Sequence, residues 1–256
     1  DRGIDEIYIE LTEVPGAQEA VAHDPHGGVR AVAQEIRTNV LRRTGLTCSV
    51  GVTPNKLLAK LASELDKPDG LTVLTAEDVP RLVWPLPVQR INGIGPRAAD
   101  KLHTLGIRTI GELAARPQAE LVEAFGRSQG RWLHEAAHGR DDRPVVTHSE
   151  PVSTSRETTF ERDLHAVRDR AELSAVFTRL CERVATDLQR KGYQARTVGI
   201  KLRFDDFRTV TRDLTLHAPT ADARELRRAA GQCLKRVDLT RRLRLLGVRA
   251  AGLTRG

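Results

Sequence analysis

Two adjacent carboxylates, Asp5 and Glu6, lie near the start of the chain in the run G-I-D-E-I-Y-I-E. Paired carboxylates near the end of a strand can bind Mg²⁺ for phosphoryl transfer, because hard cations prefer oxygen ligands. Neighbouring residues of a strand point to opposite faces, so both side chains can reach one ion only near a turn or bend. Acidic pairs are also common on solvated surfaces, and the pair alone does not decide between these interpretations.

A lysine near an expected helix start is the second candidate. In T-P-N-K-L-L-A-K, the ammonium of Lys56 could meet a triphosphate as a point charge. Lys60 lies on the same face of that helix, one turn further along. The alternative interpretation is a solvated lysine on an exposed helix.

The segment I-N-G-I-G-P-R-A-A-D-K-L, residues 91–102, predicts a tight turn between two short helices. Gly93 and Gly95 have no Cβ and allow a ligand to approach the backbone closely. The N–H groups of the helix that begins near Pro96 would face an anion, and Lys101 adds a cation in the same motif. The pattern indicates a helix-hairpin-helix that grips a DNA backbone phosphate without reading the sequence. The alternative is a plain glycine turn.

Alternating patterns near the C-terminus predict strands with one apolar and one basic face. In the last of them, R-R-L-R-L-L-G-V-R, two arginines are expected opposite Leu243 and Leu245. Aromatic residues make up only 4% of the chain, so we expect a duplex backbone to be held without base stacking. The alternative is a solvated sheet face. The polar side chains expected on the basic face are Thr154, Arg156, Thr158, Lys201, Arg203, Arg242 and Arg244.

The segment H-E-A-A-H, residues 134–138, matches the H-E-x-x-H pattern of zinc proteases. His134 and His138 would share one helix face, and Glu135 would be the general base. However, G-R-D-D ends the predicted helix at once, and the stretch closes a helical unit with a DNA-binding motif. We therefore favour a structural role, which elemental analysis for zinc would test. The residues that could be invoked as a third ligand are Glu150, Glu157 and Glu161.

Composition describes an ordinary globular chain of 256 residues, with 39% hydrophobic and 29% charged residues. No apolar stretch reaches the roughly 18–20 residues that span a membrane, and the acidic N-terminus is not typical of a signal peptide. The three cysteines are scattered, which indicates reduced thiols and a cytoplasmic protein. The chain contains no methionine, which suggests a fragment or a processed product.

The net charge of +7 is unevenly distributed. Residues 1–150 contain 18 Lys/Arg and 21 Asp/Glu, a net charge of −3, whereas residues 151–256 contain 23 and 13, a net charge of +10. A basic half joined to a mildly acidic half indicates a module that binds a polyanion, and nucleic acid is the expected partner. The alternative is a charge-rich solvated surface.

An α/β unit of βαβαβ order is expected to position the acidic pair and Lys56. Apolar residues at helical spacing precede Gly45, which is expected as a C-terminal cap. Thr53 and Pro54 are expected as the N-cap and the first residue of the helix that carries Lys56. Alternation and short apolar runs predict three strands, of which the first carries the acidic pair: residues 4–11, 47–52 and 70–75.

Residues 76–142 change character, with short helices broken by Pro and Gly and a capping-box pattern at Thr109 and Glu112. G-R-D-D-R-P-V-V-T-H-S-E-P is polar and typical of a linker. From residue 152 onward the expected order is strand, helix, two strands joined by D-D-F, helix and strand. This is the βαββαβ order of ferredoxin-like domains, so the chain is expected to be an α+β protein of several domains.

Together, these segments resemble the Y-family translesion DNA polymerases of the bacterial DNA polymerase IV branch. G-I-D-E-I-Y-I-E-L-T is similar to the catalytic strand of that family, and C-S-V-G-V-T-P-N-K-L-L-A-K-L-A-S-E-L-D-K-P-D-G to its palm. I-N-G-I-G is similar to the hairpin of the thumb, and G-R-D-D-R-P-V to the run into the linker. The resemblance covers essentially the whole chain. It implies this division: residues 1–75 a partial palm, 76–141 an all-helical thumb, 142–151 a linker and 152–256 a little finger.

The resemblance also implies a role for each candidate. Asp5 and Glu6 would be two of three carboxylates in a two-Mg²⁺ site that activates the primer 3′-hydroxyl. Lys56 would contact the triphosphate of a dNTP, and the amides of Gly93 and Gly95 would bind a phosphate of primer-template DNA. The arginines implied to lie along DNA in the little finger are Arg156, Arg244 and Arg249.

The chain departs from the family pattern in several ways. Ile7 replaces the usual small residue after the acidic pair, and Asn92 precedes Gly93 where proline is frequent. The first metal-binding aspartate, the fingers and a C-terminal clamp-binding peptide have no counterpart. We therefore expect an N-terminally truncated polymerase that is inactive alone and binds DNA as a monomer, with a sliding clamp as a partner of the full-length protein. The alternative is a non-catalytic protein that grips the primer-template backbone.

Overall fold

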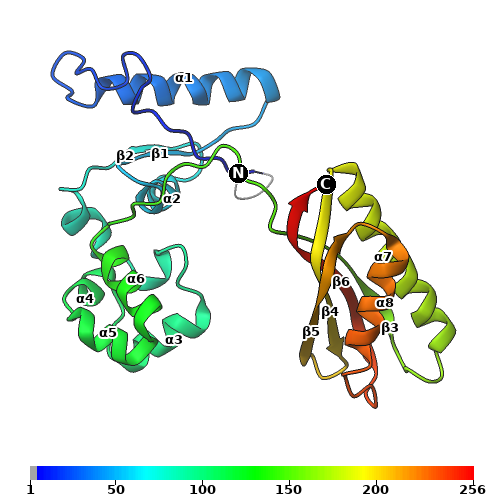
Figure 1. Cartoon of the computed structure of the whole chain (residues 1–256). Coiled ribbons are helices and arrows are strands. Elements are labelled where there is room, and N and C mark those ends of the chain that lie inside the picture. The colour runs from blue at the N-terminus through cyan, green and yellow to red at the C-terminus, as the bar shows by residue number, and fades with distance from the viewer. Residues whose placement is uncertain (1–4) are drawn as a thin grey trace. The chain divides into compact units, whose positions relative to one another are not determined.

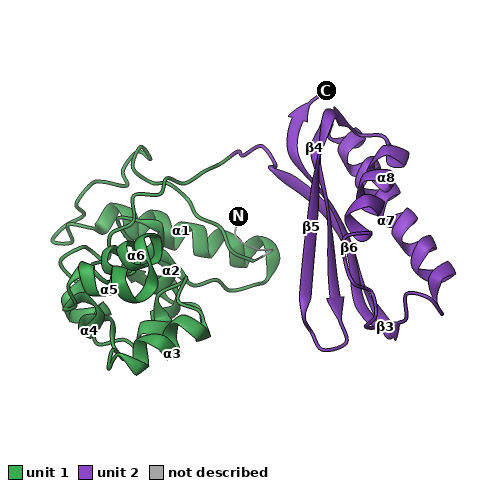
Figure 2. Ribbon diagram, turned by 60° about the horizontal axis from the view of Figure 1, so that its bottom comes forward, with its two compact units in different colours: residues 1–147 green, residues 148–256 purple. Residues whose placement is uncertain are grey.

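The computed structural model describes residues 5–256 of the chain. The chain divides into two compact units, and the boundary along the sequence lies between residues 147 and 148 (Figure 2). Each unit has a hydrophobic cluster of its own. No helix among the described residues is both long enough and apolar enough to span a membrane.

The first unit contains a small parallel sheet that lies between two helices (Figure 1). The chain passes from one strand to the other through a helix, as parallel pairing requires. The two later strands expected from the sequence are therefore present, with three paired residues each. The elements are α1 (Gly27–Thr44), β1 (Val50–Val52), α2 (Lys56–Leu65) and β2 (Leu71–Val73).

The first predicted strand, residues 4–11, is not formed in the described part of the chain. Residue 4 lies outside the described residues, and residues 6–11 lie outside any ladder. Ile7 and Ile9, which should alternate with polar residues across a sheet, are 66% and 50% exposed. Alternation stabilises a strand only when a neighbouring strand pairs with its backbone groups, and no segment within residues 5–256 does so here.

The helix ends of the first unit confirm one expected cap and correct another. Gly45 ends α1 in the left-handed region with φ 73°, and its N–H donates to Leu41 O at 2.8 Å. Thr53 is not the N-cap of α2: Asn55 holds that position, and its Oδ1 accepts the N–H of Leu58 at 3.0 Å. The hydroxyl of Thr53 instead donates to Asn55 O at 2.7 Å. The helix therefore begins two residues later than the sequence predicts.

Short helices fill the rest of the first unit and share one core with α2. Thr109 and Glu112 form the expected capping box at the start of a short helix. Leu58 and Leu61 of α2 are buried in the same cluster as Leu133, so the core continues past residue 75 into the helical part. The elements are η1 (Val79–Val83, a π-helical turn), η2 (Val88–Arg90, a 3₁₀ turn), α3 (Pro96–Thr104), α4 (Ile110–Ala114), α5 (Gln118–Phe125) and α6 (Arg127–Ala137).

The second unit is a four-stranded antiparallel sheet with two helices on one face (Figure 1). The elements are β3 (Ser153–Leu164), α7 (Arg170–Arg190), β4 (Tyr193–Phe204), β5 (Thr209–Thr220), α8 (Ala223–Leu234) and β6 (Leu243–Arg255). The strand order is β3-β6-β4-β5, so the last strand enters the middle of the sheet. The expected βαββαβ order is confirmed, and the whole chain is an α+β protein.

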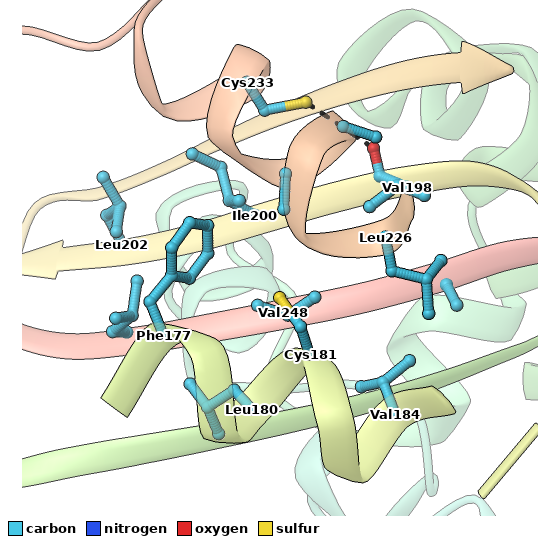
Figure 3. Packing of buried hydrophobic residues seen from close by; sticks show 14 of the residues in the cluster. Phe177, Leu180, Cys181, Val184, Val198, Ile200, Leu202, Leu226, Cys233 and Val248 are labelled. Carbon is cyan, nitrogen blue, oxygen red and sulfur yellow. Dashed lines mark hydrogen bonds between the residues drawn. The ribbon is translucent and has the colours of Figure 1, made fainter. Parts of the chain in front are cut away.

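The core of the second unit lies between the sheet and its two helices (Figure 3). Ile200 and Leu202 of β4 and Phe177 of α7 are each at most 2% exposed. Cys181 of α7 lies in the same cluster, and burial raises the pKa of its thiol to about 11. All three cysteines are free thiols, as the sequence predicts.

Candidate functional site

The N-terminus of α2 brings together groups from three parts of the first unit. Lys56 is the first residue of the helix, and its Nζ donates to Pro144 O at 2.7 Å. The ring of Tyr8 lies beside it, with its centroid 6.0 Å from that nitrogen. The side chain of Asp141 accepts the backbone N–H of Leu57 at 3.1 Å. Lys56 therefore stands at a helix start, as predicted, but its partner from the segment after α6 has no signal in the sequence.

The acidic pair is partly engaged by α2. Asp5 is exposed, whereas Glu6 is half-buried and forms an ion pair with Lys60. Lys60 also contacts Glu64 at 3.2 Å. The hydrogen bond to Glu6 raises the pKa of Lys60 above its ordinary value. The four-residue spacing from Lys56 predicts the helix face of Lys60, but nothing in the sequence identifies Glu6 as its partner.

A divalent metal ion needs more than these two carboxylates. Within residues 5–256, no three side chains of the His, Cys, Asp or Glu type gather in a metal-binding arrangement. The oxygen of Glu6 that meets Lys60 is already occupied by an ammonium. Asp5 and Glu6 therefore do not fit a Mg²⁺ ion by themselves.

The glycine hairpin lies at the start of α3, as predicted. Gly93 has φ 117°, a backbone region that favours glycine, and a Cβ there would lie 2.7 Å from the ring of Trp132. Gly95 is the N-cap of α3 and provides no side-chain cap for the first N–H groups of the helix. A Cβ on Gly95 would meet no atom within 4 Å. The first glycine is thus required by packing, whereas the second leaves space above a helix N-terminus.

A surface pocket of about 660 Å³ opens beside this hairpin. Lys101 lines the pocket, but its ammonium donates to Ala124 O and lies 4.9 Å from the centroid of the Phe125 ring. The pocket therefore combines a cation held against its wall with the uncapped start of a helix, which suits an anion. Its lining includes Gly93, Gly95, Arg97, Lys101, Phe125 and Gln129.

The uncovered face of the sheet in the second unit carries part of the predicted basic set. Residues that pair directly across antiparallel strands share a face. Gly199 pairs with Arg249 and Lys201 pairs with Gly247, so Lys201, Arg203 and Arg249 lie on one face. The apolar residues between them on β4 point instead into the core under α7 and α8.

Acidic and hydroxyl side chains lie on the same face. Lys201 forms an ion pair with Glu157 of β3 at 2.8 Å, and Arg203 Nε donates to Thr209 Oγ1 of β5 at 3.2 Å. Arg249, in the central strand β6, is exposed. The face therefore carries basic side chains next to acidic and hydroxyl side chains. The sequence of each strand alone does not reveal these neighbours.

Arg156 does not lie on this face, contrary to the prediction. It pairs across β3 and β6 with Val248, whose side chain is buried under the helices. Its Nε forms an ion pair with Asp187 Oδ2 of α7 at 2.6 Å, which holds the pKa of that carboxyl below its ordinary value. Thr154 and Thr158 share this side, because side chains alternate along β3. Arg156 therefore links an edge strand to a helix.

A β-bulge near the start of β6 reverses which face of the sheet its side chains occupy. Phe204 pairs with Leu243, but its neighbour Arg203 pairs with Leu245, so β6 contains one extra residue at Arg244. The prediction that Leu243 and Leu245 share the apolar face is therefore wrong. Leu243 belongs to the core, whereas Leu245 lies on the face of Arg203 and outside that cluster.

The remaining two predicted arginines lie at this end of the sheet. Arg242 is exposed and directly precedes β6. The guanidinium of Arg244 lies 4.8 Å from the centroid of the Phe207 ring and 3.7 Å from a carboxylate oxygen of Asp163. Arg244 is thus held between an aromatic ring and an acid.

The H-E-A-A-H segment places two rings side by side at the end of α6. The ring centroids of His134 and His138 are 4.5 Å apart, and His138 packs edge-on against Trp84. Glu135 contacts His134 Nδ1 at 3.3 Å and Arg140 at 3.4 Å. In the described part of the chain, these side chains and their neighbours do not form a group of three that could hold a metal ion.

Comparison with known proteins gives matches along most of the chain. Residues 151–256 match the impB/mucB/samB family C-terminal domain, residues 1–64 match the impB/mucB/samB family, and residues 76–107 match the IMS family HHH motif. A DNA polymerase IV of Streptomyces coelicolor is 38% identical over 250 residues, which are 98% of this chain and 50% of that protein.

Two further relatives extend this result. A DNA polymerase IV of Alkalilimnicola ehrlichii is 39% identical over 251 residues, which are 98% of this chain and 67% of that protein. A DNA polymerase IV of Moorella thermoacetica is 43% identical over 233 residues, which are 90% of this chain and 57% of that protein. The chain spans 50% to 67% of the length of these three relatives.

Proposed function

This chain belongs to the Y-family DNA polymerases of the DNA polymerase IV type, and we propose that the protein acts in template-directed nucleotidyl transfer past damaged bases. The glycine hairpin carries this proposal furthest, because Gly95 leaves open space above the uncapped N-terminus of α3. Such a site suits a backbone phosphate, which main-chain N–H groups bind without reading base sequence. A polymerase needs contacts of this kind, since it must move along any primer-template.

The uncovered sheet face of the second unit supports a further contact with the same DNA. Guanidinium and ammonium groups suit the phosphate oxygens of a duplex. Arg156 is not part of this proposal, because its guanidinium is bonded to α7 on the other side of the sheet. The basic residues on the uncovered face or at its end are Lys201, Arg203, Arg242, Arg244 and Arg249.

Lys56 is proposed to contact the triphosphate of an incoming dNTP. Its ammonium donates one N–H to Pro144 O, which leaves two N–H groups for an anion. Asp5 and Glu6 would contribute two carboxylates to a Mg²⁺ centre, and at least one further ligand would come from outside the described residues. Magnesium would supply charge neutralisation for the phosphates.

The proposal also divides the chain into domains and names its partners. We propose a palm over residues 1–75, a thumb over 76–141, a linker over 142–151 and a little finger over 152–256. Primer-template DNA and a dNTP are the partners, with a sliding clamp as a partner of the full-length protein. We also propose a monomer in the cytoplasm, where reducing conditions suit the three free thiols.

A non-catalytic DNA-binding protein is the second candidate function. The ion pair between Glu6 and Lys60 favours it, because that pair uses an oxygen that a metal ion would need. Primer extension with Mg²⁺ and dNTPs, run on the 256-residue chain and on the complete product of its gene, separates the two. We expect the 256 residues to bind primed DNA without extending it, and the complete product to extend it. Robust synthesis by the 256 residues would contradict the first expectation, and binding without synthesis by both would favour the second candidate.

The hairpin proposal has a matched pair of variants. Gly95→Ala places a methyl group in open space, so we expect the unfolding free energy to fall by no more than about 1 kcal/mol. The same methyl group would stand between α3 and a phosphate, so affinity for primed duplex is expected to fall about tenfold. Gly93→Ala must displace the ring of Trp132 and should destabilise the first unit. Fluorescence anisotropy and calorimetry measure both effects, and unchanged DNA affinity in Gly95→Ala would argue against the phosphate contact.

A further inference from the structure

The segment after α6 returns to the N-terminus of α2 and is hydrogen-bonded along it. Asn55 caps α2 with its Oδ1, and its Nδ2 donates to Gly139 O at 2.7 Å. At the other end of the segment, Pro144 O accepts from Lys56 Nζ at 2.7 Å. We call residues 139–144 the strap. The strap is the structural reason why the ammonium of Lys56 has a defined place.

Asp141 lies at the centre of the strap. Its side chain is 7% exposed, and its Oδ2 accepts the N–H of Leu57 at 3.1 Å. Arg143 binds both oxygens, with Nε 2.6 Å from one and Nη2 2.9 Å from the other. This guanidinium holds the pKa of Asp141 below its ordinary value. A carboxylate that stays charged at a helix N-terminus is stabilising, so Asp141 acts as a second cap of α2.

These caps decide what α2 can offer to an anion. An α-helix leaves about four N–H groups unbonded at its start, and here Asn55 and Asp141 accept two of them, from Leu58 and Leu57. The start of α2 therefore differs from the uncapped start of α3. Anion binding at this end of α2 depends on the ammonium of Lys56, whose position is set by the strap.

We propose that Asp141 is a positioning residue for Lys56: it fastens the strap to α2, and the strap holds the ammonium where a triphosphate binds. This inference rests on the nucleotide contact proposed for Lys56. Asp141 does not itself contact the nucleotide, because its oxygens are bonded to Leu57 and Arg143.

Simple electrostatics makes the opposite prediction, which sharpens the test. Removing a carboxylate near an anion site should tighten anion binding. If Asp141 positions Lys56, Asp141→Ala instead weakens it. Asp142, the exposed next residue, provides the matched control, because Asp142→Ala removes the same charge and none of the strap contacts given for Asp141.

The experiment is a titration of the 256-residue chain with inorganic triphosphate by calorimetry. We expect Asp141→Ala and Lys56→Ala to weaken binding to a similar extent, with no further loss in the double variant, because one residue acts through the other. Asp141→Asn keeps an oxygen acceptor for Leu57 and should restore most of the affinity. Unchanged or tighter binding in Asp141→Ala, or additive losses in the double variant, would overturn the inference.

A second measurement does not depend on triphosphate binding. The rate at which acetic anhydride acylates Lys56, read by peptide mass spectrometry, should rise several-fold in Asp141→Ala and remain unchanged in Asp142→Ala. An unchanged rate in both variants overturns the inference. If the wild-type chain binds no triphosphate while the acylation rate still depends on Asp141, the positioning role stands and the proposed nucleotide contact fails.

Discussion

The two units differ in how completely their β structure is paired. In the second unit β4 and β6 are 12 and 13 residues long and have a partner on both sides. In the first unit β1 and β2 pair over three residues each, and the alternating segment 6–11 pairs with nothing among the described residues. The difference shows that apolar and polar residues can alternate within a single segment, whereas a strand forms only when a second segment pairs with its backbone.

The cations at the start of α2 and those on the sheet of the second unit also differ in how far protein groups already bind them. Around α2, the cations Lys56, Lys60 and Arg143 are each bonded to oxygens of the first unit. In the second unit, Lys201, Arg203 and Arg244 also contact protein groups, but Arg249 of β6 and Arg242, which directly precedes that strand, are exposed. The cations around α2 are therefore held by contacts inside the first unit. On the uncovered sheet face, the exposed arginines can exchange bound water for phosphate oxygens.

DNA binding should show the largest effect of this contrast. If the five basic residues on the uncovered face or at its end contact phosphates, raising salt from about 50 to 200 mM should lower affinity for primed duplex by about 500-fold, because each contact contributes about 0.9 to the slope of log affinity against log salt. The triple variant Arg203→Ala, Arg242→Ala, Arg249→Ala should reduce the slope of log affinity against log salt by about 0.9 for each lost contact. Arg156→Gln, on the opposite face of the sheet, is the control and should leave the slope unchanged. A flat salt response in the wild-type chain would remove the basis for the uncovered face as a DNA site.

Core truncations test whether the units unfold separately. Ile200→Ala in the second unit and Leu113→Ala in the first remove side chains that are 2% and 0% exposed. Each should cost about 2–5 kcal/mol, because the cavity adds to the lost transfer free energy. In scanning calorimetry we expect two transitions, with each variant lowering the temperature of one. A single transition that both variants shift equally would contradict independent cores.

Helix caps provide a smaller and more local comparison. Asn55→Ala in the first unit and Asp222→Ala in the second each remove a side-chain acceptor from a helix start. A cap contributes about 1 kcal/mol, and Asn55 should contribute more than Asp222 because it also donates to Gly139 O. Thr53→Ala is the control and should cost less than Asn55→Ala, because its hydroxyl caps no helix N–H. Chemical unfolding measures all three, and equal losses at Thr53 and Asn55 would contradict the observed cap.

The smallest expected effect is a pH dependence confined to the first unit. Hydrogen bonds from the backbone and hydroxyl of Thr75 and from Arg81 lower the pKa of Asp78 to about 2. Because the folded pKa is lowered, the contribution of Asp78 to stability is complete above its ordinary pKa of 3.8 and is lost as pH falls toward about 2. The difference in melting temperature between the wild type and Asp78→Asn should therefore shrink over this range. A constant difference from pH 6 to pH 2 would contradict the assignment.

Features with local causes were predictable from the sequence. Gly45 ends α1 because glycine adopts the left-handed region without strain, and Thr109 with Glu112 makes a capping box within four residues. The glycine hairpin before α3 and the βαββαβ order of the second unit followed from patterns within single segments. In each case the residues that determine the structure are near neighbours in the chain.

Features that depend on distant partners were not predictable. Arg156 and Lys201 carry the same charge in similar alternating strands, but the register of β3 against β6 turns Arg156 toward α7. The bulge that moves Leu245 to the uncovered face arises from the pairing of β4 with β6. The bond from Asp141 to Leu57 joins residues 84 positions apart. No single segment contains the information that sets these contacts.

The contact between Gly93 and the ring of Trp132 has a practical consequence. The chain has only two tryptophans, and the ring of one of them, Trp132, packs against the backbone of the hairpin at Gly93. Indole emission responds to the polarity and charge around the ring, so a phosphate bound at the hairpin should alter the fluorescence of Trp132. Replacing Trp84, whose Nε1 donates to Ala137 O at 3.0 Å, would leave a single emitter. The protein would then report DNA engagement at this site optically, without an attached dye.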